Sequence, residues 1–437
     1  MGNFRQSLSR IRRQLITLMV AAEWFGLLNH LARLAIALMP DRFETYQALG
    51  SALQRTGQLS KAVSVWAEGM AAQQRAARRS QVSPSVRYLA RSWTVAIGHH
   101  ALVDVIAKRQ VLGLSPADRY VIICRNREAA NFSYLQIWKN WFEIVTEAQE
   151  IDRLADQIRL AEDYLTVLAY GKEWRWFHEV MHRVQEQWEA SGCGPLLTLP
   201  AEYEERGRDA LAIFGMPSDA WFVTLHIREG SRSVRNTNRD DYLQAMQKIT
   251  DAGGWVVRIG GPLSPPLPAM ERVVDYASFS QRAEMLDVFL MARARFFLGT
   301  NSGPAWVAGT FGVPAVLTNW APLGIMSTYE SITVPRLLWV DRDRRLLTFA
   351  EQLAEPFGFI ESVRHLRRFG VSQVDNSPSE ISEAVDEMLQ KTAGAWTKDV
   401  EDLKRQQRFR ELQRRFNATG RSSIGSSFLR RNAALLN

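Results

Sequence analysis

Cysteine is nearly absent from the 437-residue chain, which contains only Cys124 and Cys193. Two thiols cannot build the multiple disulfide bridges that stabilise small secreted domains. The sequence also begins without the charged segment, apolar core and small-residue cleavage site of a secretory signal peptide. We therefore expect a protein of the reducing cytoplasm.

Long hydrophobic runs are also absent. The most apolar stretch, residues 15–28, contains Glu23 and is shorter than the ~20 residues that a spanning helix needs. Arg10, Arg12 and Arg13 precede it, so a helix lying at the inner membrane surface stays open as an interpretation. Packing of this stretch within a helical bundle is the interpretation that we favour.

Acidic residues are too few to balance the basic ones, with 46 against 54, which gives a net charge of +8. This excess suits an anionic partner such as a nucleotide diphosphate, an anionic lipid surface or a nucleic acid. Several of the basic residues lie in one C-terminal stretch, which has few aromatic residues that could stack on bases. We therefore expect no nucleic-acid partner, and we favour the interpretation that this stretch is a helix with its basic side exposed to solvent. Its basic residues are Lys404, Arg405, Arg408, Arg410, Arg414 and Arg415.

The length predicts more than one domain, because single cores stop growing at roughly 250–300 residues. Residues 1–85 are expected to form a helical extension, residues 86–215 and 216–375 two Rossmann-like domains, and residues 376–437 a basic helical tail packing back on the first domain. The extension resembles one tetratricopeptide repeat in spacing. The residues at that spacing are Tyr46, Leu49, Gly50, Leu53, Ala62 and Trp66.

Two series of strand and helix patterns predict the Rossmann-like domains. The first has a strand at 92–97, the turn Gly98-His99-His100, a helix at 101–112, a strand at 120–124, and long helices to about residue 189. The second has strands at 221–227, 255–259, 296–298 and 315–317 that alternate with helices at 240–252, 282–292 and 304–311. This alternation is typical of a parallel sheet, which binds ligands at the carboxyl ends of its strands.

Polar residues follow these strands and suit a diphosphate. His226 and Arg228 lie two residues apart, hence on one side of a strand end, and an arginine offers paired donors and a permanent charge. The residues after the strand at 296–298 open a helix whose free amides attract anions, although Asn301 or Ser302 could equally be the helix N-cap. The candidate donor-binding residues are His226, Arg228, Arg235, Asn236, Arg258, Gly260, Thr300, Asn301, Ser302, Gly303 and Asn319.

Together these motifs resemble a known family. The His226-x-Arg228 strand, the Asp287-Val-Phe-Leu-Met-Ala helix, the Leu298-Gly-Thr-Asn-Ser-Gly turn and Gly312-Val-Pro look like a bacterial family of GT-B glycosyltransferases. That family is similar to heptosyltransferases and, through the His-x-Arg strand, to α-1,6-fucosyltransferases. The resemblance covers roughly residues 91–347.

The resemblance implies roles for individual residues. Arg228 would grip the donor diphosphate, while Thr300, Ser302 and the Gly303 amide would hold phosphate or sugar hydroxyls. Gly98-His99 would face the acceptor. Glu229 stands where the fucosyltransferases often carry a second consecutive arginine, which argues against GDP-fucose as the donor.

Glycosyl transfer needs a base for the acceptor hydroxyl and positive charge for the departing diphosphate. His99 is our first candidate for the base, because histidine titrates near neutral pH. Asp104 and Glu229 are the alternatives, and His99 could instead only hydrogen-bond the sugar.

Asp341-Arg342-Asp343 follows an apolar run and has the form of the DxD motif of metal-dependent GT-A enzymes. Arg342, Arg344 and Arg345 crowd this segment with positive charge, which opposes capture of a divalent cation. We therefore expect a surface turn there, no metal site and no cofactor.

These arguments predict an α/β protein of the GT-B type, with two Rossmann-like domains facing a cleft, a tetratricopeptide-like extension and a helical tail. The predicted activity is metal-independent sugar transfer from a nucleotide-sugar to a cell-surface glycan, a lipid-linked glycan or a protein, with inversion favoured by analogy. The alternative is a non-catalytic scaffold with a degenerate nucleotide-binding fold and a repeat-like arm that binds a protein partner. Convergence of anion-binding residues at one sheet edge favours the enzyme.

Overall fold

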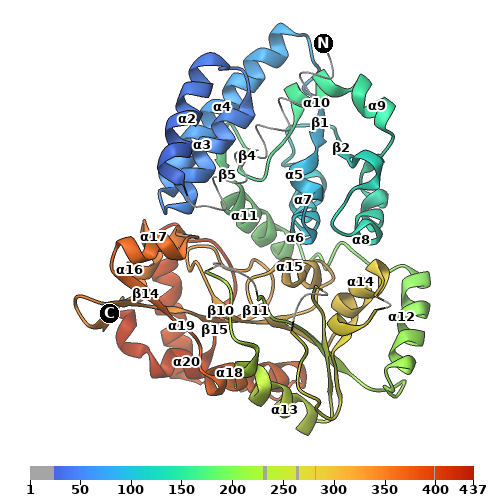
Figure 1. Cartoon of the computed structure of the whole chain (residues 1–437), viewed down its shortest axis with the longest axis vertical. Coiled ribbons are helices and arrows are strands. Elements are labelled where there is room, and N and C mark those ends of the chain that lie inside the picture. Colours follow the sequence, from blue (N-terminus) through green and yellow to red (C-terminus); the bar gives the residue numbers. More distant parts are fainter. Residues whose placement is uncertain (1–23, 230–233, 262–264, 281, 398) are drawn as a thin grey trace.

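The computed structural model describes residues 24–229, 234–261, 265–280, 282–397 and 399–437 (Figure 1). Arg10, Arg12, Arg13 and most of the stretch considered for the membrane surface lie outside these residues. No helix among the described residues is both long and apolar enough to span a bilayer.

A helical extension opens the described chain, with α2 (Phe25–Leu38), α3 (Phe43–Arg55) and α4 (Leu59–Arg79). Two glycines let α3 and α4 approach closely, since a Cβ at Gly50 would lie 2.1 Å from Nε1 of Trp66 and one at Gly69 would lie 2.6 Å from Cβ of Tyr46. The predicted helices are confirmed, and their assignment to the tetratricopeptide class stays a prediction.

The first α/β unit contains a sheet of three parallel strands in the order β1-β2-β3. These are β1 (Val86–Leu89), β2 (Arg119–Ile123) and β3 (Glu143–Val145). Three helices connect β1 to β2, namely α5 (Arg91–Thr94), α6 (Ile97–Ala101) and α7 (Val103–Val111). The predicted βαβ unit, its second strand and its helix are therefore confirmed.

The predicted strand at 92–97 is wrong, because these residues form α5 and the start of α6, and the strand lies earlier, at β1. Aromatic and β-branched residues favour a strand, but short apolar runs do not distinguish strand from buried helix. For residues 92–97, tertiary contacts favour the helical conformation over the strand. Trp93 is fully buried and donates its indole N–H to the carbonyl of Asp163 at 2.8 Å, which anchors the helical turn.

The remainder of this unit is less helical than predicted, because a strand and a hairpin interrupt the helices. The helices are α8 (Phe132–Ile137), α9 (Ala148–Arg153), α10 (Ala155–Ala161) and α11 (Phe177–Ala190), and the hairpin is β4 (Val167–Tyr170) with β5 (Glu173–Trp176).

The second α/β unit is built on a seven-stranded parallel sheet in the order β15-β11-β10-β9-β6-β7-β8. Its strands are β6 (Phe222–His226), β7 (Trp255–Arg258), β8 (Val273–Val274), β9 (Phe296–Gly299), β10 (Ala315–Trp320), β11 (Ser331–Pro335) and β15 (Ser423–Ile424). The accompanying helices are α12 (Ala201–Ile213), α13 (Leu243–Asp251), α14 (Glu284–Arg293), α15 (Gly303–Thr310) and α18 (Pro378–Thr392). All four strands and three helices predicted for this unit are confirmed, and so is the α/β class.

A small antiparallel sheet lies beside the main one. It consists of β12 (Leu337–Val340), β13 (Arg345–Leu346) and β14 (Val371–Val374), with α16 (Phe349–Leu353) and α17 (Val363–Arg368) nearby. Asp341-Arg342-Asp343 forms the exposed turn between β12 and β13, so this segment is the surface turn that we expected.

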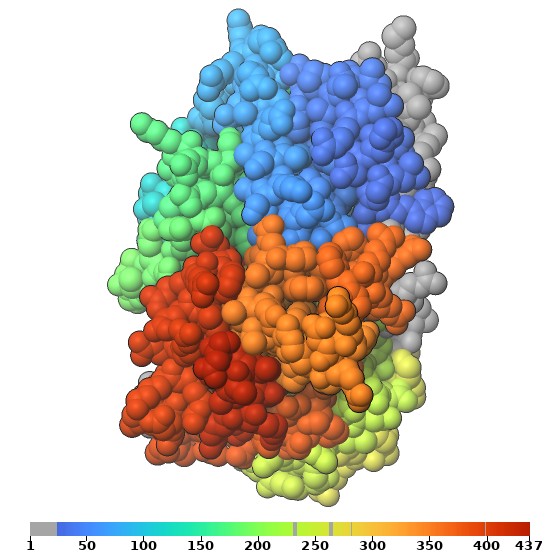
Figure 2. All heavy atoms as spheres, turned by 90° about the vertical axis from the view of Figure 1, so that its left-hand side faces the viewer, coloured from blue at the N-terminus to red at the C-terminus, as the bar shows by residue number. Residues whose placement is uncertain are grey.

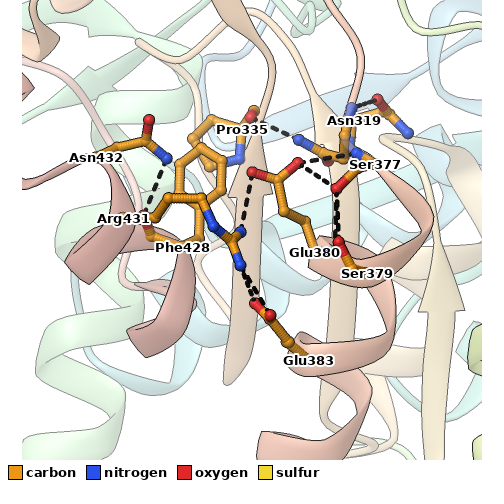
Figure 3. A network of polar contacts seen from close by, with 10 residues as sticks. Asn319, Pro335, Ser377, Ser379, Glu380, Glu383, Phe428, Arg431 and Asn432 are labelled. Atoms are coloured by element: carbon orange, nitrogen blue, oxygen red, sulfur yellow. Dashed lines mark hydrogen bonds and ion pairs between the residues drawn. The ribbon is translucent and has the colours of Figure 1, made fainter.

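The C-terminal tail completes the second unit. After α18 it forms α19 (Val400–Arg415), the sheet strand β15 and α20 (Ser426–Arg431). Arg431 of α20 contacts Glu380 at 3.3 Å and Glu383 at 2.8 Å on α18 (Figure 3). The tail reaches the first unit through Arg421, which lies 2.6 Å from Glu189 of α11.

The two α/β units are in direct backbone contact where α6 meets the start of α15. A Cβ at Gly98 would lie 2.7 Å from Cα of Gly303, and a Cβ at Gly303 would lie 2.7 Å from the Gly98 nitrogen. Only glycine at both positions permits this approach. It places α6 of the first unit over the first turn of α15.

Two polar contacts flank this backbone contact. Tyr329 of the second unit donates to Oδ2 of Asp104 at 2.9 Å, and Oε2 of Glu284 accepts from the amides of Phe132 and Ser133 at 2.8 and 3.0 Å, which caps α8 from across the interface. The helical extension adds a third link, because Ser60 donates to Glu355 at 2.6 Å. Figure 2 shows the blue surface of the extension against the orange surface of the second unit.

Replacing Gly98 with alanine should separate α6 from α15. We expect Gly98→Ala to lower the free energy of unfolding by about 1–3 kcal/mol, because the new methyl group meets backbone that cannot rotate away. Urea unfolding measures this loss. Gly194→Ala is the matched control, since a Cβ there meets nothing within 4 Å. Equal stability of the two variants would contradict the contact.

Candidate functional site

The carboxyl ends of β6 and β9 form the centre of the candidate site. His226 lies opposite Gly299 in the parallel register, and a Cβ at residue 299 would lie 2.2 Å from the His226 carbonyl oxygen. Glycine therefore lets the two strand ends close together, so that His226 and Thr300 are neighbours.

Three buried polar atoms at this edge have no hydrogen-bond partner among the described residues. They are Nδ1 of His226, Oγ1 of Thr300 and Oγ of Ser302. Ser302 occupies the N-cap position of α15 yet makes no side-chain capping bond. Buried polar groups without partners are uncommon, because leaving one unpaired costs about 1–3 kcal/mol. Of the two residues considered for the N-cap, Ser302 therefore holds the position without a capping bond from its hydroxyl, which remains available to a ligand.

Arg228 extends beyond β6 at the same edge and is half-buried. Burial lowers the pKa of its guanidinium, and the charge of Arg235 lowers it further. No described carboxylate forms an ion pair with Arg228. The positive charges of Arg228 and Arg235 therefore repel each other without a described carboxylate beside Arg228 to offset the repulsion. An anion between them would relieve both effects.

Arg336 positions the loop that carries Arg235. Its buried guanidinium donates to the carbonyl oxygens of Val234 and Asn236 and forms an ion pair with Asp375 at 2.7 Å. Asn236, a predicted ligand, thus contributes a carbonyl to the support of this loop. The loop is held in place by a residue at the end of β11.

His99 follows Gly98 on α6, and the contact of Gly98 with Gly303 brings this histidine beside the start of α15. Its Nδ1 lies 2.7 Å from the Ser92 carbonyl oxygen. A carbonyl only accepts, so the neutral imidazole carries its proton on Nδ1 and leaves the Nε2 lone pair free. Burial lowers the pKa of His99, the Ser92 carbonyl raises it, and Arg235 lowers it, with a net shift below the ordinary 6.5.

His178, at the start of α11, is a neighbour that the sequence did not reveal. Burial lowers the pKa of His178 to about 4, with a smaller contribution in the same direction from His99 in its protonated form. Nδ1 of His178 is buried without a partner among the described residues, and its ring packs 5.0 Å from that of Trp176 and 6.4 Å from that of Trp306 on α15.

Four predicted site residues already form ion pairs or hydrogen bonds with other residues of the protein. Arg258 is buried and lies 3.2 Å from Asp275 and 3.3 Å from Glu229, so its charge and that of Glu229 are already paired. Asp104 lies 2.5 Å from Lys108 and accepts from Tyr329, within the interface rather than at the strand edge. Gly260 offers its carbonyl to Arg282 at 2.5 Å.

Two predicted asparagine ligands are also engaged. Asn319 is fully buried with φ +49°, accepts from the Asn376 amide at 2.8 Å and donates to Thr237 at 2.9 Å. Figure 3 shows Asn319 beside the start of α18. Asn301 donates to the Ala321 carbonyl at 3.2 Å. The amide of Asn319 is thus engaged through both its oxygen and its nitrogen, and Asn301 uses its nitrogen to hold the loop at Ala321.

The structure therefore brings together His226, Arg228, Arg235, Thr300, Ser302 and Gly303 from the second unit with His99 from the first. The sequence could have indicated Arg336, because it follows a parallel strand at the ligand edge. No local pattern marks His178, since only the packing of α11 brings it near His99.

Two surface hollows lie elsewhere on the second unit. One of about 710 Å³ is lined by Lys248, Arg295 and Asp386, among others, between α13 and α18. Arg295 immediately precedes β9, so this hollow opens at the amino ends of the strands. It is therefore on the side of the sheet opposite to the candidate site.

No known family profile and no curated protein matches the chain. Solved structures similar to it include a glycosyl transferase family 9 protein from Veillonella parvula, with 12% identity, TM-score 0.46 and coverage of 71% of this chain and 98% of that one. The E. coli heptosyltransferase WaaC with ADP-2-deoxy-2-fluoro heptose has 10% identity, TM-score 0.31 and coverage of 65% and 98%.

A third structure is an O-GlcNAc transferase mutant from Thermobaculum terrenum, with 14% identity, TM-score 0.26 and coverage of 96% and 89%. Similarity to fucosyltransferases stays a prediction. The function is therefore argued from the site itself.

The ring of His226 should titrate far below a normal histidine. Burial is the main cause, followed by Arg228 and Arg258, and together they lower its pKa to about 4. We expect Arg228→Ala to raise this pKa, measured by NMR titration of ring-labelled histidine, while Arg239→Ala leaves it unchanged. In the unfolded chain His226 regains its ordinary pKa of 6.5, so between pH 6.5 and 4 the unfolded state binds a proton that the folded state does not. The free energy of unfolding therefore decreases as the pH falls through this range. A wild-type pKa near 6.5 would refute the buried placement.

Proposed function

We propose that the protein is a glycosyltransferase that binds the diphosphate of a nucleotide-sugar at the carboxyl ends of β6 and β9. The observation that carries this proposal is the half-buried Arg228, without a described counter-ion, beside the partnerless polar atoms of His226, Thr300 and Ser302. A diphosphate supplies both the negative charge and the acceptor oxygens that this group of donors lacks.

The start of α15 supplies further donors. Gly303 is its first residue, and the amides of the first helical turn point out of the helix with a partial positive charge. The hydroxyls of Thr300 and Ser302 lie next to this turn. One phosphate at the helix start and the other beside Arg228, with Arg235 nearby, would place each negative charge next to a donor of this edge.

Transfer itself then needs the acceptor on the opposite side of the sugar. The Nε2 lone pair of His99 accepts the proton of an acceptor hydroxyl, and that oxygen forms a bond to the anomeric carbon. The bond from this carbon to the diphosphate oxygen breaks, and the electron pair leaves with the diphosphate, which Arg228 and Arg235 stabilise. Attack opposite to the leaving group inverts the anomeric configuration. In this scheme arginines neutralise the leaving group, so no metal is required.

The acceptor is proposed as a hydroxyl of a glycan, a lipid-linked glycan or a protein. Glu229, the alternative base, is half-buried and already forms an ion pair with Arg258 at 3.3 Å. Asp104 is paired with Lys108 and lies within the interface. His99 is therefore the base that the local hydrogen bonds favour.

Nucleotide binding tests the donor site. With EDTA present, we expect one member of a panel of GDP, UDP, ADP, CMP and dTDP sugars to raise the melting temperature in a saturable way. Arg228→Ala should weaken its affinity roughly ten-fold or more, because hydrogen bonds to charged groups contribute about 1.5–3 kcal/mol.

The control for this experiment is Arg342→Ala, since that guanidinium is 94% exposed in the turn after β12. It should leave affinity unchanged. Absence of binding by any of the nucleotides to folded wild-type protein would reject the donor site and favour the non-catalytic scaffold.

Substitution of His99 separates proton transfer from binding. His99→Gln should reduce the transfer rate about 10²- to 10⁴-fold while donor affinity is retained. His30→Gln, at an exposed position on α2, is the control. In wild type the rate should fall as the pH drops below the pKa of His99, which lies under 6.5. Transfer at the wild-type rate in His99→Gln would exclude His99 as the base.

A further inference from the structure

Helix α2 exposes a row of large apolar side chains. The row, named here the α2 ridge, consists of Trp24, Leu27, Leu31, Leu34 and Leu38, whose exposed fractions lie between 42% and 74%. Their spacing of three or four residues places them along one side of the helix. Helix α2 lies on the outer face of the extension, the darkest blue region of Figure 2.

A neighbouring side of α2 already provides its packing within the fold. Phe25, Leu28 and Ala32 are buried against the rest of the extension. The α2 ridge is therefore not needed for attachment of the helix. Contiguous apolar surface of this kind on a protein marks a site for a protein or membrane partner.

Basic side chains lie at the end of the α2 ridge. The ion pair of Arg79 with Asp41, at 2.7 Å, brings the end of α4 beside the turn between α2 and α3. Arg42 and Arg78 are exposed in the two segments that this ion pair joins, and the exposed Leu38 is the last residue of α2. Residues 24–79 contain seven Lys or Arg and only three Asp or Glu. A partner that fits this surface has an apolar part that contacts the α2 ridge and a negatively charged part that contacts the basic residues at its end.

We propose that the α2 ridge inserts into the surface of an anionic lipid bilayer, with Arg42 and Arg78 binding acidic headgroups. Helix α2 spans 14 residues, or about 21 Å, and would lie parallel to the membrane with its apolar side roughly 5–10 Å deep. The proposal is independent of the proposed transferase activity, because it involves no residue of the candidate site.

A second copy of the chain is the competing occupant, because a spacing of three and four also occurs in paired helices. Pairs of that kind gain orientation from opposite charges beside the seam. Arg33 is the only charged residue within α2, so two copies would bring no acidic partner to it. The bilayer therefore accounts for both the apolar and the basic parts of the surface.

Flotation of the full-length protein with lipid vesicles tests the proposal. Wild type should bind vesicles of phosphatidylglycerol and phosphatidylcholine more tightly than vesicles of phosphatidylcholine alone. The combined variant Leu27→Gln, Leu31→Gln, Leu34→Gln should lose roughly 100-fold in partition, because the inserted apolar area is removed. Arg42→Gln with Arg78→Gln should lose roughly ten-fold on the anionic vesicles only.

The matched control replaces Val111 and Ile213 with glutamine, since both are exposed apolar residues outside the α2 ridge. It should bind vesicles like wild type, and all variants should keep the wild-type melting temperature. Equal wild-type binding to both vesicle types, or full binding by the triple variant, would overturn the proposal. So would a dimer, seen by ultracentrifugation, that the triple variant abolishes in the absence of any vesicle binding.

Discussion

The backbone contact between Gly98 and Gly303 determines how the two α/β units meet, and the candidate site depends on it. Without side chains at these positions, α6 rests directly on the first turn of α15. His99 is the next residue after Gly98, so this approach carries it to the edge where Ser302 precedes α15. The site is thus a product of the interface, and neither unit contains it alone.

The central strands of the second unit were predictable because β6, β7, β9 and β10 are apolar and largely buried, so local pattern and tertiary environment agree. The six residues of β10, for example, are all buried. The first unit was less predictable, because residues 92–97 have strand-like composition yet form helical turns around Trp93. Two-residue strands such as Ser423–Ile424 have no periodicity at all, so the completion of the main sheet by the tail could not be foreseen.

The position of the site was predictable, since parallel strands carry their ligand residues at one edge, and Arg228, Thr300 and Ser302 lie there. The partners of each charged group were not. Arg258 has the same strand-end position as a phosphate ligand, but Asp275, 17 residues further on, neutralises it. Contacts between residues that are distant in the sequence determine which cations can bind a ligand, and local sequence patterns do not predict these contacts.

The core of the helical extension also contains Ile325 and Phe359 from the second unit. Residues 25–70 leave the ribosome long before these two side chains exist. At roughly 5–20 residues per second, the interval is on the order of tens of seconds. During that time the inner faces of α2 to α4 lack part of their packing and are exposed to other nascent chains. Folding of this protein in the cell is therefore expected to involve a chaperone that binds its amino-terminal helices during translation.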